Sequence, residues 1–242
     1  MKMNAACRLC SDIGTFILKR PGVRTLIKFS TPEERDSYCA RILQRINVEV
    51  SDYNVLNMHR VGIETPPQFV YEELLQWDDN SQYWPNNLAR VNRINGSLEN
   101  IVIYLFGLKK LKIPWLRHLE FSFPPLFNMN AIRFQESPTA TELDGARYLL
   151  YKCSGGYPIG IFCLYIRRRI AGLNEKENVQ LFSLVAFNFY GKKNWFFNNI
   201  VRFIWENIHN RASANILNKM KASFEKKFEE QLKTAAVHAS DV

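Results

Sequence analysis

The sequence predicts an α+β protein in which an antiparallel β-sheet is followed by a long C-terminal helix. Three patterns predict this class: short strands with brief connections over residues 88–190, a periodic apolar stripe over residues 194–232, and a hairpin-plus-helix pattern at the N-terminus. Hydrophobic residues make up 47% of the 242-residue chain and aromatic residues 13%, enough for a substantial core. This composition excludes low-complexity disorder for most of the length.

The first 50 residues predict a ββα extension. Two apolar segments flank a Pro21-Gly22 turn, which indicates a hairpin over residues 13–30. A helix is expected next, because Thr31 suits the N-cap, Pro32 suits the first helical position and Glu34 completes a capping box. Such a small segment cannot build a core of its own, so we expect it to pack on the rest of the chain.

The region from residue 53 predicts the sheet. A strand over residues 55–64 precedes a short apolar helix that reaches Trp77. Turn signals such as Asn95-Gly96 then separate a series of strands, and consecutive strands with short connections form an antiparallel sheet. The expected strands span residues 88–94, 98–106, 119–134, 146–154, 158–169 and 180–190.

Both faces of this sheet are predicted to be covered. A sheet with one wet face alternates apolar and polar residues, but the strands at 158–169 and 180–190 are apolar almost throughout. We expect the N-terminal extension to cover the second face, with a homodimer contact as the alternative.

The C-terminal helix carries the clearest periodic pattern. Its apolar residues step by three or four: Val201, Trp205, Ile208, Ala212, Ile216, Met220, Phe224 and Phe228. Burying each large side chain contributes roughly 1.5–3 kcal/mol. The stripe is therefore expected to lie on the sheet, on a lipid surface or on another copy. Residues 235–242 are expected to form a disordered tail.

Several short motifs resemble the START-like (SRPBCC, birch-pollen-allergen-like) superfamily. The resemblance covers residues 54–230 and rests on loose patterns and on the order of the elements. The motifs are Gly62-Ile63-Glu64-Thr65-Pro66-Pro67, Val70-Tyr71 with Leu74, Trp77-Asp78 and Tyr83-Trp84-Pro85. It implies a helix-grip fold over residues 51–234, with a curved antiparallel sheet wrapped around the C-terminal helix and a cavity between them. Residues 1–50 lie outside it.

The resemblance implies a binding function without fixing an activity. Superfamily members include lipid and sterol carriers, hormone receptors, polyketide cyclases and aromatases, and quinone-binding chaperones. We expect a lipid or other apolar small molecule to be bound in the cavity, for transport or presentation. The alternatives are a cyclase- or aromatase-like enzyme with polar groups around His209 or Tyr151, and a non-catalytic interaction protein with a filled core.

The cavity is expected to be occupied. An empty apolar pocket of about 300 Å³ would cost on the order of 7 kcal/mol, so a ligand, water or packed aromatic rings must fill it. The residues predicted to line it are Trp84, Ile103, Phe127, Met129, Tyr151, Tyr165, Phe187, Trp205 and His209.

No motif assigns a catalytic residue, a metal or a cofactor. The four histidines do not stand at metal-ligand spacings, and Cys7 and Cys10 form a single CxxC with no second pair. There is no nucleophile elbow, P-loop or dinucleotide-binding glycine motif. Five cysteines without framework spacing favour free thiols, and the weak N-terminal apolar stretch is not typical of a signal peptide; both features favour the cytoplasm.

The charge indicates an anionic partner. The formal net charge is +9, which favours acidic surfaces in general. Lys109, Lys110 and Lys112 with Trp115 form a basic aromatic segment, predicted either as a solvated loop or as a contact with an anionic membrane surface. Nucleic acid is not expected as a partner, because no RNA-binding signature is present.

Overall fold

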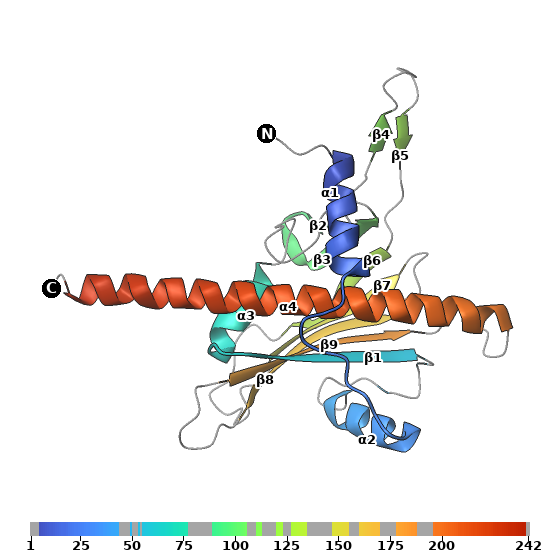
Figure 1. Cartoon of the computed structure of the whole chain (residues 1–242), viewed down its shortest axis with the longest axis horizontal. Helices are drawn as coiled ribbons and strands as arrows, with labels where there is room; N and C mark the ends of the chain where they lie inside the picture. Colours follow the sequence, from blue (N-terminus) through green and yellow to red (C-terminus); the bar gives the residue numbers. More distant parts are fainter. Residues whose placement is uncertain are drawn as a thin grey trace.

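The computed structural model describes residues 5–43, 49, 53, 55–76, 89–105, 110–112, 120–122, 127–134, 147–154, 160–169, 178–187 and 196–240. These residues form a seven-stranded sheet in the order β1-β9-β8-β7-β6-β3-β2, and a long helix, α4, lies across it (Figure 1). Every neighbouring pair of strands is antiparallel, as predicted. Among the described residues, no helix is both long and apolar enough to cross a membrane.

The strands lie close to their predicted positions. They are β1 (Val55–Ile63), β2 (Ala89–Ile94), β3 (Ser97–Leu105), β6 (Phe127–Phe134), β7 (Arg147–Ser154), β8 (Ile161–Arg169) and β9 (Asn178–Phe187). Between β2 and β3 the backbone is left-handed at Asn95 (φ 53°) and Gly96 (φ 72°), as the predicted two-residue turn requires.

The single strand predicted over residues 119–134 is wrong. This region contributes β5 (Glu120–Ser122), which pairs with β4 (Lys110–Lys112) in a separate small sheet, and β6 of the main sheet. Lys110 and Lys112 therefore lie in a strand. Lys109 and Trp115 lie outside the described residues.

Helix α4 (Phe196–Ser240) supplies the main helical layer and extends past the sheet at both ends (Figure 1). Leu217, Met220 and Phe224 are 0–5% exposed, in one apolar cluster with strand residues and with helix α3 (Pro67–Leu75). Ile208 is 46% exposed, so this part of the predicted apolar stripe does not pack on the sheet. The segment from residue 235 was expected to be a disordered tail, but the helix continues to Ser240.

The predicted N-terminal hairpin is wrong in its first half. Residues 5–18 are helical: α1 (Ala5–Asp12) runs into a π-helical turn, η1 (Ile13–Leu18), and Phe16 is buried beneath Lys219 of α4. A short apolar run fits a strand or a helix equally well, and contact with α4 selects the helix here.

The second half of the predicted hairpin is extended, but its partner is β1. We call residues 19–31 the strap. Ile27 N donates to Met58 O (3.0 Å) and Arg60 N donates to Thr25 O (2.8 Å), so the strap follows the free edge of β1. Covering an edge strand in this way blocks edge-to-edge pairing with other chains.

Helix α2 (Pro32–Leu43) begins as predicted. Glu34 N donates to Thr31 Oγ1 (3.1 Å), and the Glu34 carboxylate accepts from Ser30 N (2.7 Å). Cys39 of α2 is fully buried against the sheet face opposite α4, in a cluster with strand residues such as Tyr148 and Phe182. This confirms that the N-terminal extension covers the second face. The domain bounds at residues 50 and 234 stay a prediction.

Candidate functional site

Four of the predicted lining residues lie together on the sheet face that carries α3 and α4, called here the inner face. Ile103, Tyr151 and Phe187 are 0–2% exposed in one cluster, and Trp205 packs against it. The Trp205 ring contacts the Phe187 ring (centroids 4.5 Å apart) and stacks on His209 (4.4 Å). The structure therefore brings these residues together with His209, and their role as ligand contacts stays a prediction.

The other predicted lining residues do not join them. Tyr165 lies on the opposite, outer face, where its ring packs 5.7 Å from that of Phe182 beneath α2; its assignment to the cavity is wrong. Phe127 and Met129 are in β6, opposite Ile103 and Cys153 respectively, but their side chains lie outside the described part of the chain. Trp84 is also outside the described residues.

The space beneath the second half of α4 is filled by side chains. Leu217, Met220 and Phe224 pack there against the sheet, and the rings of Phe69 and Phe228 lie 5.2 Å apart beside them. This stretch of the predicted cavity is therefore closed by apolar packing.

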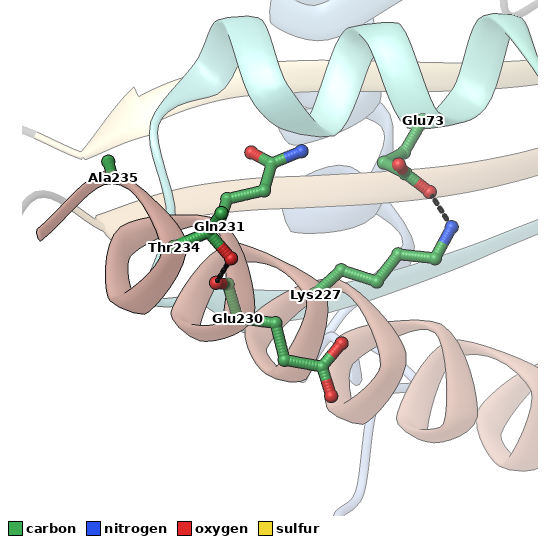
Figure 2. Close-up of a pocket in the computed structure, with 6 residues that line it drawn as sticks. All are labelled: Glu73, Lys227, Glu230, Gln231, Thr234 and Ala235. Atoms are coloured by element: carbon green, nitrogen blue, oxygen red, sulfur yellow. Dashed lines mark hydrogen bonds and ion pairs between the residues drawn. The ribbon is translucent and has the colours of Figure 1, made fainter. Parts of the chain in front are cut away.

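A depression of about 600 Å³ opens on the surface instead, between α3 and the C-terminal part of α4 (Figure 2). Glu73 and Lys227 form an ion pair across it, and Thr234 Oγ1 donates to Glu230 O (3.0 Å). It is open to solvent, and five of its six lining residues are polar or charged. Such an open depression does not enclose a ligand as an apolar binding pocket does.

A buried polar cluster ties β1, the strap and α4 together. His59 is 1% exposed; its Nδ1 lies 2.9 Å from Thr25 Oγ1, and its Nε2 lies 3.2 Å from Asn210 Oδ1. Burial lowers the pKa of His59 to about 4, against a weaker opposing effect of the hydrogen bond to Asn210. The imidazole is therefore neutral at physiological pH. Because the Asn210 oxygen can only accept, Nε2 carries the proton and Nδ1 accepts from the Thr25 hydroxyl.

His209 extends this cluster toward the apolar residues. Its Nε2 lies 3.3 Å from Ser213 Oγ. Burial, and secondarily the nearby His59, lower the pKa of His209 to about 3, so this ring is neutral as well. Asn57 and Ser183 are also buried and lie on the same face of the sheet as His59. Asn57 is two residues before His59 on β1, and Ser183 is opposite His59 on β9. No group of three or more metal-binding side chains occurs in the described ranges.

A second polar cluster lies on the inner face around Arg147. Arg147 is 6% exposed, its guanidinium carbon lies 5.6 Å from the centre of the Tyr71 ring, and its Nε and Nη1 have no hydrogen-bond partner among the residues that the structure describes. Arg93 of β2 donates to Leu75 O at the end of α3 (2.7 Å).

Tyr151 joins the Arg147 cluster as a neutral phenol. Its hydroxyl donates to Leu98 O (3.1 Å). Burial raises the pKa of Tyr151, and Arg93 acts weakly in the opposite direction. The Arg147 guanidinium therefore lies beside the phenol of Tyr71, and no described carboxylate forms an ion pair with Arg147.

Sequence reasoning did not select His59 or Arg147. The signal was present in the two-residue period of the strands. Asn57 and His59 share one face of β1 with the apolar Val55 and Val61, and Arg147 shares a face of β7 with Leu149 and Tyr151. Polar residues at inward positions of otherwise apolar strands are the feature that would have identified them.

No family model and no curated protein matches this chain. The solved structures that it is similar to include the Zhui aromatase/cyclase from a Streptomyces strain (15% identity, TM-score 0.41, 72% of this chain and 95% of that one). A second is the di-domain aromatase/cyclase StfQ from the steffimycin biosynthetic pathway (11% identity, TM-score 0.41, 84% of this chain and 64% of that one). A third is a norcoclaurine synthase point mutant of Thalictrum flavum with a transition-state analogue (10% identity, TM-score 0.35, 69% of this chain and 95% of that one). Such low similarity transfers no chemistry to this chain.

The chain's own elements establish its architecture. A strand, a helix, a set of antiparallel strands and a C-terminal helix follow one another, the first and last strands are neighbours in the sheet, and the last helix lies across the inner face. The chain thus has the helix-grip architecture that the resemblance to the START-like superfamily implied.

Proposed function

We propose that this protein binds an apolar small molecule that carries a negatively charged group, such as a carboxylate, with Arg147 neutralising that charge. The observation that supports this proposal is the burial of Arg147, 6% exposed, with its Nε and Nη1 unpaired among the described residues. Binding of an apolar molecule agrees with the expectation drawn from the sequence, and the charged group is part of the proposal, suggested by Arg147.

A buried guanidinium with unpaired N–H donors is costly. Arginine keeps its positive charge in proteins, so it cannot escape the cost of burial by losing a proton. The penalty for burying an unpaired ion is several kcal/mol, a large part of a domain's typical stability of about 5–15 kcal/mol. The planar guanidinium pairs with a carboxylate through two parallel hydrogen bonds, which makes an acidic ligand the natural complement.

The surroundings of Arg147 suit the apolar part of such a ligand. Leu149 and Tyr151 follow on the same face of β7, and Val91, Ile101 and Ile103 extend the apolar surface across β2 and β3. Helix α4 packs chiefly on β1, at the other edge of the sheet, and fills that part of the inner face. The ligand is therefore proposed to lie on the β2, β3 and β7 side.

The test compares binding of a fluorescent long-chain fatty acid with binding of the fatty alcohol that has the same chain and dye. The wild type should bind the acid at least tenfold more tightly, because truncating one partner of a buried charge pair typically costs 2–5 kcal/mol. Arg147→Met should reduce affinity for the acid to that for the alcohol, and Arg147→Lys should retain part of the preference. Fluorescence titration measures all of these.

Arg167→Met is the matched control. Arg167 is exposed on β8, one residue beyond Ile166 and therefore directed away from the inner face. This variant should bind like the wild type. Equal affinity of the wild type for acid and alcohol, or an unchanged preference in a folded Arg147→Met protein, would contradict the proposed charge pairing. Failure of the wild type to bind either probe would contradict the proposed function.

A second candidate is an enzyme of the cyclase or aromatase type, in which polar groups of the inner face move protons. The polar cluster that this hypothesis requires around His209 is present, with His209 beside Ser213 and near His59. If His209→Ala leaves turnover of candidate polyketide substrates unchanged, the assignment of His209 as a proton carrier is wrong.

A further inference from the structure

The exposed apolar side chains of the described chain gather on one surface. Among the described residues, nine large apolar side chains are exposed, and six of them belong to the first half of α4 and to the chain segment that crosses it. These six are Leu18 (64%), Val23 (55%), Ile200 (44%), Phe203 (67%), Ile204 (52%) and Ile208 (46%). Contiguous apolar exposure of this kind marks an interaction surface on a folded protein.

Four of the six residues lie on a single stripe of α4, and the other two, Leu18 and Val23, belong to η1 and the strap. Ile200, Ile204 and Ile208 are one turn apart, and Phe203 lies beside them. Continuing along the same stripe by three or four residues reaches the side chains that hold η1 and the strap. These are Arg211, which donates to Leu18 O (3.3 Å), Asn215, which donates to Lys19 O (2.8 Å), and Asn218, which donates to Val23 O (2.9 Å). The strap thus covers the stripe from residue 211 onward, and residues 200–208 are left exposed.

The charge of this surface is strongly positive. Between Asp12 and Glu33 the sequence has four basic residues and no acidic one: Lys19, Arg20, Arg24 and Lys28, all exposed. On α4, Arg211 is exposed at the strap, and Glu206 is paired with Arg202 (3.1 Å). Exposed apolar side chains therefore adjoin a basic segment, and this combination is typical of helices that lie in the headgroup region of anionic membranes.

We infer that this face, the α4–strap surface, docks on an anionic lipid bilayer, with Phe203, Ile204 and Ile208 inserting and the strap contacting the headgroups. It is defined by Leu18, Lys19, Arg20, Val23, Arg24, Ile200, Phe203, Ile204, Ile208 and Arg211. A second copy of the chain is a poorer occupant, because a two-fold contact would bring identical basic side chains together. The inference does not depend on the proposed ligand.

The experiment is co-sedimentation of the full chain with vesicles of phosphatidylcholine alone or with one quarter phosphatidylserine. The wild type should bind the anionic vesicles at least tenfold more tightly, and the preference should weaken as salt is raised. Phe203→Glu with Ile204→Glu should abolish binding. Arg20→Gln with Arg24→Gln should weaken it on the order of 25-fold, about five-fold per residue.

The same helix supplies the control. Leu232 and Val237 are also exposed (55% and 58%) but lie at the other end of α4, so Leu232→Glu with Val237→Glu should bind vesicles like the wild type. Equal binding to neutral and anionic vesicles, or an equal loss in this control, would overturn the inference. So would sedimentation velocity showing that the wild type is a dimer that Phe203→Glu with Ile204→Glu converts to a monomer without affecting vesicle binding.

Discussion

At the scale of single residues, the molecule is distinguished by buried polar groups at inward strand positions. His59 is held neutral between a hydroxyl of the strap and an amide of α4, and Arg147 is held charged beside Tyr71. Both residues depart from the apolar pattern of their strands, and such departures concentrate at functional sites. His59 has a direct consequence for stability, because its protonation differs between the folded and unfolded chain.

The prediction for His59 concerns acid stability. The folded pKa is about 4 and the ordinary value is 6.5. The contribution of neutral His59 to the free energy of unfolding is therefore fully present above pH 6.5. It is lost as the pH falls from 6.5 toward 4, because only the unfolded chain takes up the proton on His59 in that window. The loss is about 1.4 kcal/mol per pH unit for one group. In His59→Gln, urea unfolding between pH 7 and pH 4.5 should show a correspondingly shallower decline.

Thr25→Val is the control for this effect. It removes the hydroxyl that donates to His59 but leaves the imidazole in the chain. It should lower the free energy of unfolding at every pH, by about 1 kcal/mol, without removing the decline. A decline in His59→Gln as steep as in the wild type would show that His59 does not titrate differently on unfolding.

At the scale of the elements, the helices differ in what fixes them. Helix α4 is held by apolar packing along its second half, whereas α2 starts at a side-chain cap and presents Cys39 to the outer face. The cap is a local interaction that the sequence alone specifies. Its contribution can therefore be measured by a substitution that leaves the packing intact.

The prediction for α2 is that Thr31→Ala lowers the free energy of unfolding by about 1 kcal/mol, the usual loss when an N-cap hydroxyl is removed. The reason is that Glu34 N loses its acceptor, which lies at 3.1 Å. Ser37→Ala is the matched control, because Ser37 is an exposed residue of the same helix. It should change stability by less than about 0.5 kcal/mol. Urea denaturation measures both, and equal stabilities of the two variants would show that the cap contributes nothing.

At the scale of the whole molecule, the sheet is enclosed from both sides by segments far apart in the sequence. Helices α3 and α4 cover the inner face, and α2 with the strap covers the outer face and the edge of β1. The N-terminal segment also reaches α4, so it contacts both layers. Its removal should therefore affect the entire fold.

The corresponding prediction is that a chain lacking residues 1–43 aggregates or binds the dye ANS strongly. The deletion exposes the outer-face cluster, which includes Met58, Tyr148, Tyr165 and Phe182. Each such side chain contributes roughly 1.5–3 kcal/mol when buried, and the sum is comparable to the stability of a whole domain. Removal of residues 231–242 is the control and should leave folding intact, because side chains 231–237 are exposed. A monomeric, ANS-negative chain after the N-terminal deletion would contradict the role of this cover.

The sequence by itself determined the local features of this protein. Most strands of the main sheet, the long C-terminal helix, the cap at Thr31, the Asn95-Gly96 turn and the need for a cover on the second face all follow from short-range chemistry and composition. Each of these depends on residues within one element or on the fraction of apolar positions in a strand.

Only the tertiary structure decided which side of a strand faces which helix. Because β8 and β9 are apolar on both faces, their sequence pattern does not specify which residues lie on the inner face and which on the outer face. The packing of α2 on the outer face is what places Tyr165 there. Contact with α4 likewise made residues 13–18 helical, and it paired His59 with Asn210, 151 positions away. Contacts of that separation form between elements, and no local pattern of residues encodes them.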